Sequence, residues 1–344
     1  MLSRARIWGF LALVILELWL PRVAHAETVG DFYRGKTVRL VIGFEPGTAY
    51  DLYARLLARH IGKHLPGAPT VVPQNMAGAG SLNAYNYTFN VAPRDGTVVG
   101  TGHRFVPLMP LFDLPGARFE ADKFTYIGSA NKEVDICVAR ADSGIERPAD
   151  LQERELLVGT TGAGAELTTF YATIRRTLGA KLKVISGYKS QNDLFLAIER
   201  GEIQGRCGGS YSSVLSEHPD WITQRFIKVW MQIGLQKDRQ LPQVPILSEL
   251  IKDDTDRRAV ELMVSPNSMG RPFFGPPDVP EARVFALRAA FDASMMDPEL
   301  LAEAGKQNLE INPIGGQDML RLVAEAYRTS KEIVERAKSL VNSQ

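Results

Sequence analysis

The 344-residue chain carries a net charge of only +1 at pH 7. Residues 1–26 hold three arginines and one glutamate, so the remainder carries −1. So small a net charge excludes the basic surface with which proteins bind nucleic acid or an anionic membrane. The roughly 318 residues that follow exceed the size at which a single hydrophobic core usually stops growing, so we expect two domains.

Residues 1–26 have the pattern of a signal peptide. Arg4 and Arg6 precede an apolar run over residues 7–20, and Ala24-His25-Ala26 is a small-residue cleavage site. Glu17 within the apolar run is unusual and leaves an uncleaved anchor as the alternative. No later stretch reaches the roughly 18 apolar residues of a second span. We therefore expect export to the periplasm with cleavage after Ala26.

A strand, a tight loop and a helix are predicted from residue 38 onward. The apolar run at 38–42 suits a strand that is buried on both faces, and Pro46 and Gly47 end it. Thr48 is an N-cap candidate for a helix whose leucines recur at helical spacing. Such a loop leaves backbone N–H groups unpaired at a helix N-terminus, where an anion is favoured. We interpret it as half of a binding site for a small carboxylate.

The same unit occurs twice more. A strand at 70–72 is followed by Gly78 and Gly80 before a helix near Ser81, and a strand at 156–160 is followed by Gly162 and Gly164. In open parallel sheets, ligands bind outside the carboxyl ends of the strands, where such loops lie. Three glycine-bearing loops of this kind therefore point to a shared ligand site.

Strands and helices alternate through the middle of the chain, with strands expected at 97–101, 124–128, 136–139, 182–186, 203–207 and 227–233. This alternation predicts an α/β fold with mostly parallel sheets. Helices are expected at 256–264, 281–296, 298–307 and 317–341, and they should pack back onto the first domain. The predicted domains are 27–128 with 256–344, and 129–255, and the ligand cleft lies between them.

Cys137 and Cys207, the two cysteines of the chain, both fall in predicted strands. An oxidising compartment would permit a disulfide between them. Two buried free thiols are the alternative, because free cysteine is among the most buried residue types.

Seven sequence segments, which span nearly all of the chain after the leader, resemble the extracytoplasmic solute receptors of tripartite tricarboxylate transporters, the Bug family. They are FEPGTAYDLYAR, QNMAGAGSLNAYN, APRDGTVVGT, GTTGAGAE, SGYKSQNDLFLAIERGEIQG, LPQVPILSEL and FFGPPDVP. The resemblance implies a two-domain type II periplasmic-binding-protein fold that closes on a carboxylate-bearing solute and delivers it to a membrane permease. The family usually has glycine where this chain has Thr48 and Ser81.

The candidate ligand-binding residues lie in the three loops and in one further helix start. They are Thr48, Ala49, Asp51, Asn75, Ala79, Gly80, Ser81, Thr160, Thr161, Gly162, Ala163 and Asp193. Backbone N–H groups should supply most of the contacts. Helix capping is the alternative for Asp51, and Asp193 rests on the resemblance alone. We expect Arg104 on the surface, with a counter-charge to the ligand as the alternative, and Glu166 solvated or capping a helix unless the ligand carries an amine.

An enzyme and a ligand-sensing receptor for a membrane signalling protein are the rival functions. The two G-x-G segments lack the third glycine of a dinucleotide site, and the chain has no G-x-S-x-G, H-E-x-x-H or C-x-x-C. We therefore expect no catalytic residue, no metal and no cofactor. The signalling receptor would share the fold and the site. The protein is expected to be a monomer.

Overall fold

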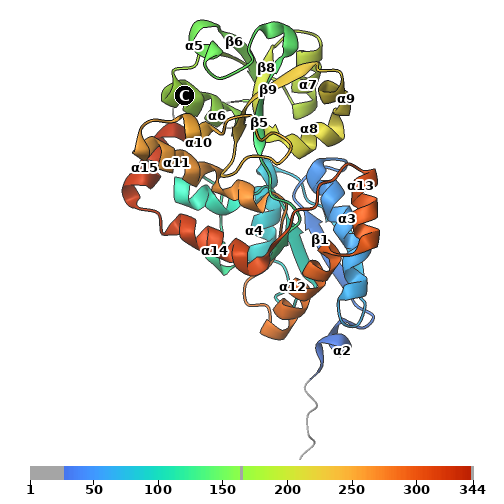
Figure 1. Cartoon of the computed structure of the whole chain (residues 1–344). Coiled ribbons are helices and arrows are strands. Elements are labelled where there is room, and N and C mark those ends of the chain that lie inside the picture. Colours follow the sequence, from blue (N-terminus) through green and yellow to red (C-terminus); the bar gives the residue numbers. More distant parts are fainter. Residues whose placement is uncertain (1–26, 163–165, 342–344) are drawn as a thin grey trace, which may run out of the picture.

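The computed structural model describes residues 27–162 and 166–341. The predicted signal peptide and Ala163 thus lie outside the described residues. Two sheets, each covered by helices, lie one above the other (Figure 1). We call the six-stranded sheet with its helices the first lobe and the five-stranded sheet with its helices the second lobe. The predicted fold class, two helix-flanked sheets of the periplasmic-binding type, is confirmed.

The first-lobe sheet is built around β1, in which Val38 and the residues from Leu40 onward are buried. Parallel pairing joins β1 to β2 and β3, while β10 and β11 run antiparallel to their neighbours. The order across the sheet is β11 (Ile314–Gly315), β4 (Thr125–Ser129), β10 (Pro272–Gly275), β3 (Val98–Thr101), β1 (Thr37–Ile42) and β2 (Thr70–Asn75).

The second-lobe sheet has β6 and β8 beside each other near its centre. Here β6 is parallel to β7 and β8, whereas β5 is antiparallel to β8 and β9. The order is β7 (Leu182–Ser186), β6 (Leu156–Thr160), β8 (Gly205–Ser210), β5 (Asp135–Arg140) and β9 (Ile227–Ile233).

Both sheets are mixed, which corrects the prediction of mostly parallel sheets. The chain crosses from β4 in the first sheet to β5 in the second within a few residues, so β5 enters its sheet from the edge at which the other parallel strands end. The chain returns through η6 (Ser265–Met269) to β10, which also runs antiparallel to its neighbours. Strand alternation alone shows neither reversal, because the local hydrophobic pattern is the same in both directions.

Helices cover both sheets. Those against the first sheet are α2 (Val29–Tyr33), α3 (Ala49–His64), α4 (Leu82–Asn90), α12 (Glu281–Met295), α13 (Pro298–Lys306) and α14 (Gly316–Tyr327). Those of the second lobe are α5 (Asp150–Glu153), α6 (Glu166–Leu178), α7 (Gln191–Glu199), α8 (Tyr211–Glu217), α9 (Pro219–Thr223), α10 (Leu247–Leu250), α11 (Asp254–Val264) and α15 (Lys331–Val341). Short 3₁₀ turns occur at η2 (Ala79–Ser81), η3 (Val106–Phe112), η4 (Ala121–Lys123) and η5 (Ala141–Ser143).

The long helix predicted over 317–341 is divided into α14 and α15. Helix α14 contacts β4 of the first sheet, whereas α15 packs on α11 and α6. Apolar residues of α11 and α15, such as Val260 and Ala337, belong to the buried cluster of the second sheet. The C-terminal helices therefore cover both lobes rather than the first alone, as Figure 1 shows on the left of the molecule. The limits of the two domains stay a prediction.

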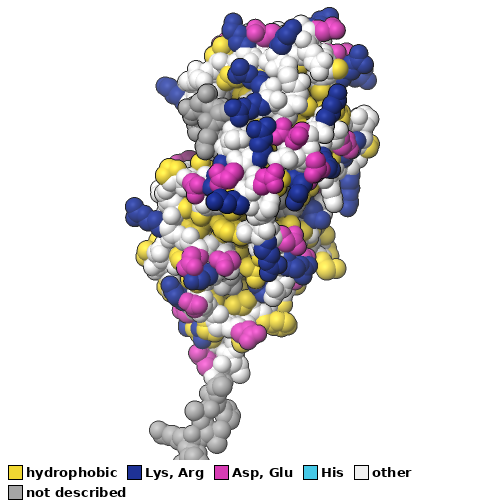
Figure 2. All heavy atoms as spheres, turned by 90° about the vertical axis from the view of Figure 1, so that its left-hand side faces the viewer, with side chains coloured by type: hydrophobic (Ala, Val, Ile, Leu, Met, Phe, Trp, Pro, Cys, Tyr) yellow, Lys and Arg dark blue, Asp and Glu magenta, His cyan; other side chains and the backbone are white. Residues whose placement is uncertain are grey.

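Cys137 and Cys207 form a disulfide, which settles the alternative left open by the sequence. The two residues lie opposite each other on β5 and β8, and both are fully buried. Acidic and basic side chains alternate over both lobes on the face shown in Figure 2. Within the described residues, each helix is too short or too polar to cross a bilayer.

Candidate ligand-binding site

The first predicted loop links β1 to α3 and is held by a compact set of hydrogen bonds. Thr48 is the extended N-cap residue of α3, and its hydroxyl donates to Glu45 O at 2.9 Å. Asp51 is buried and accepts from the amide of Gly47 at 2.9 Å. Asn75, at the end of β2, donates to Asp51 Oδ1 at 2.8 Å and to Phe44 O at 2.9 Å. Asp51 and Asn75 therefore shape the loop from inside.

The amides at the start of α3 remain for a ligand. The first N–H groups of a helix have no acceptor within the helix, and Ala49 opens α3. Asp51 is charged and close to these amides, and it also accepts from Arg55 Nε at 2.9 Å. Because Arg55 balances Asp51, the loop can favour an anion despite the nearby carboxylate.

The second predicted loop is strained. Four consecutive residues, Gly78 to Ser81, have φ values of 125°, 48°, 61° and 79°. Left-handed backbone costs a non-glycine residue about 1–2 kcal/mol, so Ala79 and Ser81 need support. Ser81 Oγ donates to Gly43 O at 3.0 Å, and a Cβ on Gly43 would lie 2.7 Å from that of Ser81. The glycine at position 43 thus lets the first and second loops touch.

Strained non-glycine residues cluster at binding sites, where the surrounding structure over-determines them. The two first-lobe loops meet at the carboxyl ends of β1 and β2, so Thr48, Ala49, Ala79, Gly80 and Ser81 share one edge of the sheet. Their arrangement fits the predicted role of these residues, which stays a prediction.

The third predicted loop follows β6 in the second lobe. Thr160 is fully buried, and its Oγ1 lies 2.7 Å from Thr168 Oγ1, which donates to Gly162 O at 2.6 Å. Thr161 is exposed beside it. Asp193 lies at the start of α7, at the same edge of the sheet, where the N-cap residue Ser190 accepts from its amide and donates its hydroxyl to the Asp193 carboxylate at 3.1 Å. Capping thus already engages the Asp193 carboxylate.

The two loop-bearing edges face each other. His103 follows β3 in the first lobe and Glu166 opens α6 in the second, and His103 Nε2 lies 3.6 Å from Glu166 Oε2. Arg104 Nη2 lies 3.5 Å from Glu166 Oε1. Burial opposes the charge on Glu166, but Arg104 and His103 outweigh it and lower its pKa to about 2. Among the described residues, no hydrogen bond joins the predicted site residues of one lobe to those of the other, so charged side chains outside the predicted set link the two edges.

Arg104 is buried, which corrects the expectation of a surface arginine. Its Nη2 lies 2.5 Å from Asp135 Oδ2, and its Nε donates to Asn267 Oδ1 at 2.7 Å. Its amide donates to the hydroxyl of Tyr50, whose ring stacks on Phe44 at 4.3 Å. The sequence signal for Arg104 was its position directly after a predicted strand. Its burial could not be predicted, because Asp135 and Asn267 lie far along the chain.

A second buried arginine spans the lobes. Arg271 opens the return strand β10, and its Nη2 lies 3.1 Å from Glu133 Oε1. Its guanidinium lies 4.5 Å from the ring of Tyr50 on α3. Ser212 of α8 donates to Glu133 at 2.9 Å. Sequence reasoning missed this group because its members are spread over four separate elements.

No family model matches the sequence. Two curated relatives match over nearly the whole chain. A UPF0065 protein of Bordetella pertussis is 22% identical over 321 residues, 91% of each chain. The UPF0065 protein of the gbd 5′ region of Cupriavidus necator is 24% identical over 328 residues, 90% of each chain.

Solved structures match over the same extent. A TctC solute binding protein from Polaromonas has a TM-score of 0.66 at 20% identity, covering 90% of this chain and 99% of that one. The periplasmic binding protein BugD has a TM-score of 0.64 at 19% identity, covering 90% and 98%. The resemblance to the Bug receptors is confirmed. MatC from Rhodopseudomonas palustris, solved with bound malate, has a TM-score of 0.62 at 18% identity, covering 89% and 99%.

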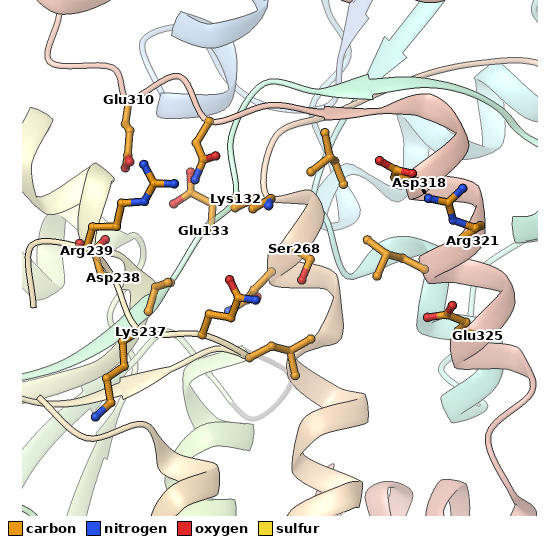
Figure 3. A pocket seen from close by; sticks show the side chains of 17 residues that line it. Lys132, Glu133, Lys237, Asp238, Arg239, Ser268, Glu310, Asp318, Arg321 and Glu325 are labelled. Carbon is orange, nitrogen blue, oxygen red and sulfur yellow. Dashed lines mark hydrogen bonds and ion pairs between the residues drawn. The ribbon is translucent and has the colours of Figure 1, made fainter. Parts of the chain in front are cut away.

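A hollow of about 460 Å³ lies at the crossing between the lobes of this Bug-like chain (Figure 3). Lys132 and Glu133 line it from the first crossing segment, and the charged ends of Glu310 and Arg239 point toward each other at one side of it. None of the predicted site residues lines it. Burial raises the pKa of Glu310, and the charges of Asp238 and Glu133 raise it further. The lining carries five carboxylates against four basic side chains, so the hollow offers an anion no surplus of positive charge, and the glycine loops stay the predicted site.

One group of possible metal ligands lies elsewhere in the Bug-like fold, between α3 and α13. His60, Asp297 and Glu299 bring their ligand atoms within 4.8 Å of one another. Lys63 Nζ already lies 2.6 Å from Asp297 and 2.5 Å from Glu299. Lys63 thus supplies the positive charge that these carboxylates contact, and the ion pairs join α13 to α3.

Proposed function

We propose that the protein is an extracytoplasmic receptor that binds a small organic acid between its lobes and delivers it to a membrane permease of the tripartite tricarboxylate type. The observation that carries the proposal is the contact of His103 and Arg104 with Glu166. It brings the carboxyl edges of the two sheets, with their glycine-bearing loops, next to each other, and this supports a ligand site between them.

Amide donors alone can supply the affinity. A hydrogen bond to a charged group contributes about 1.5–3 kcal/mol, and each helix N-terminus adds about 0.3–1 kcal/mol. Four or five such contacts from two lobes offset the cost of association and still leave the roughly −8 kcal/mol of a micromolar complex. MatC, which has a similar fold, was solved with malate, and this supports a carboxylate as the ligand here.

The crossings between the lobes support closure on the ligand. The chain passes between the sheets after β4, before β10 and between α14 and α15. Short crossings of this kind act as hinges in two-lobed binding proteins. We propose that the liganded, closed form is the one the permease recognises, and that the receptor acts as a periplasmic monomer.

A thermal-shift screen of citrate, dicarboxylates, aromatic acids, amino acids and nicotinate tests the proposal, because a ligand that binds the native state alone raises the melting temperature. We expect at least one acid to raise it in proportion to concentration, and its amide to have no effect. Calorimetry then gives the affinity, and incubation with the acid should yield no product. A chain that binds none of these acids, or converts one, would contradict the proposal. Identical small-angle scattering with and without a tight ligand would contradict closure.

A further inference from the structure

Arg206 points along β8 toward the ligand edge of the second lobe. Gly205 of β8 pairs in parallel with Val158 of β6, so Gly208 lies level with Thr161, where the predicted loop begins. Arg206 Nε and Nη2 donate to Gly208 O at 3.1 and 2.6 Å. The guanidinium therefore lies two residues nearer the carboxyl edge than its own Cα.

Arg206 makes no direct ion pair among the described residues, and the carboxylates of Glu217, Asp135 and Glu166 act on its charge only from a distance. The residue is 2% exposed, whereas the buried Arg104 and Arg271 each pair with a carboxylate. Arg206 Nη1 has no hydrogen-bond partner among the described residues. Residues 163–165 of the adjoining loop read Ala-Gly-Ala and carry no acidic side chain.

The surroundings keep the guanidinium in place without bringing a carboxylate into contact with it. The ring of Phe195 lies 4.7 Å from Arg206 Cζ, which offers a weak cation–π contact. Burial lowers the pKa of Arg206, yet an arginine stays charged at neutral pH. Gly208 has a φ of 106° and has no side chain between the guanidinium and the start of α6. A Cβ added at Gly208 would lie 3.3 Å from Leu167.

A buried charge without a partner is costly, and the cost is recovered when an opposite charge arrives. We propose that Arg206 is the counter-charge of the second lobe, which pairs with a carboxylate of the bound ligand. This inference rests on the proposed function and deepens it: recognition by loop amides is completed by one buried arginine. A guanidinium binds a planar carboxylate through parallel N–H donors, so the ligand presents a carboxylate to β8.

The test compares Arg206→Met with Arg206→Lys and with a matched control. Arg140 of the adjacent strand β5 also lies over an aromatic ring, that of Phe226 at 5.3 Å, and also donates to a carbonyl, Ile198 O. Arg140 differs from Arg206 because it forms an ion pair with Asp142 and lies at the opposite edge of the sheet. The probes are acetate and the tightest acid of the screen, each against chloride at equal ionic strength. Calorimetry measures affinity, and melting temperature without ligand measures stability.

We expect Arg206→Met to weaken binding of the acid about 10- to 100-fold while the unliganded protein melts at the same or a higher temperature. Arg206→Lys should fall between Arg206→Met and the wild type. Arg140→Met should bind the acid as the wild type does and melt at a lower temperature.

Unchanged affinity in Arg206→Met would overturn the inference and leave the proposed function standing. A melting temperature that falls in Arg206→Met as it does in Arg140→Met would show a structural role and overturn it too. A wild-type protein that binds no acid of the screen would overturn the proposed function, and the inference with it.

Discussion

Breaking the Cys137–Cys207 disulfide should strongly destabilise the second lobe. The bond joins residues 70 positions apart, and it links β5 to β8 at the centre of the sheet. By the loop-entropy relation, closing a loop of that length removes about 4.4 kcal/mol of conformational freedom from the unfolded chain at 25 °C. We therefore expect reduction to lower the free energy of unfolding by about 2–5 kcal/mol, the range found when native disulfides are removed.

Tryptophan fluorescence in urea provides the assay. In a protein that begins at residue 27, the tryptophans are Trp221 and Trp230, both in the second lobe, and Trp230 lies on β9 beside β5. The urea midpoint is compared with and without reductant, and again for a Cys137→Ala/Cys207→Ala variant. The variant should be insensitive to reductant, because it has no bond to break.

Two results would refute this reasoning. One is a pair of reactive thiols in the unreduced, unfolded protein, which would mean that the bond does not form. The other is a midpoint that moves by less than the equivalent of about 1 kcal/mol on reduction, which would mean that the unfolded chain is already constrained without the bond.

Three further outcomes are expected. Asp135→Ala should cost about 3–5 kcal/mol in urea unfolding, because among the described residues it leaves the buried Arg104 with only the longer ion pair to Glu166. Arg104→Met in the same chain should restore most of the loss. A double variant no more stable than the single one would contradict this. The lowered pKa of Glu166 means that its charge stabilises the fold above the unfolded pKa of about 4.3, and that this stabilisation is lost as pH falls toward 2. Glu166→Gln should therefore lose less stability than the wild type between pH 5 and 3. Equal losses would show that the Glu166 charge does not stabilise the fold. Thr48→Pro should weaken ligand binding at least tenfold in calorimetry while α3 stays intact, since the φ of −75° at Thr48 suits proline. The change removes the Thr48 N–H together with the hydroxyl that donates to Glu45 O. Unchanged affinity would remove Thr48 from the site.

The local units were readable from the sequence because their causes are local. The apolar run that becomes β1, the Thr48 N-cap and the leucine spacing of α3 all act within a few residues of one another. The glycines at 78 and 80 likewise mark a loop with positive φ values. The order of the segments was specific enough to identify the Bug-like architecture.

The charges of the site were not readable, because their partners come from distant elements. Arg104 meets Asp135 and Asn267 across 31 and 163 positions of sequence, and only the folded chain shows that it is buried. Arg206 differs from the other two buried arginines because no carboxylate of the described residues contacts it, and no sequence pattern predicts this. The mixed strand directions and the split of the last helix have the same origin, since each depends on which sheet a segment reaches.

Hydrophobic periodicity, capping residues and glycine loops thus determined the elements and the edge at which a ligand would bind, because these signals depend on neighbours along the chain. Tertiary structure decided which ionisable groups of the described residues are buried, and which of them form a direct ion pair. The free energy of a buried charge depends on everything that surrounds it in space.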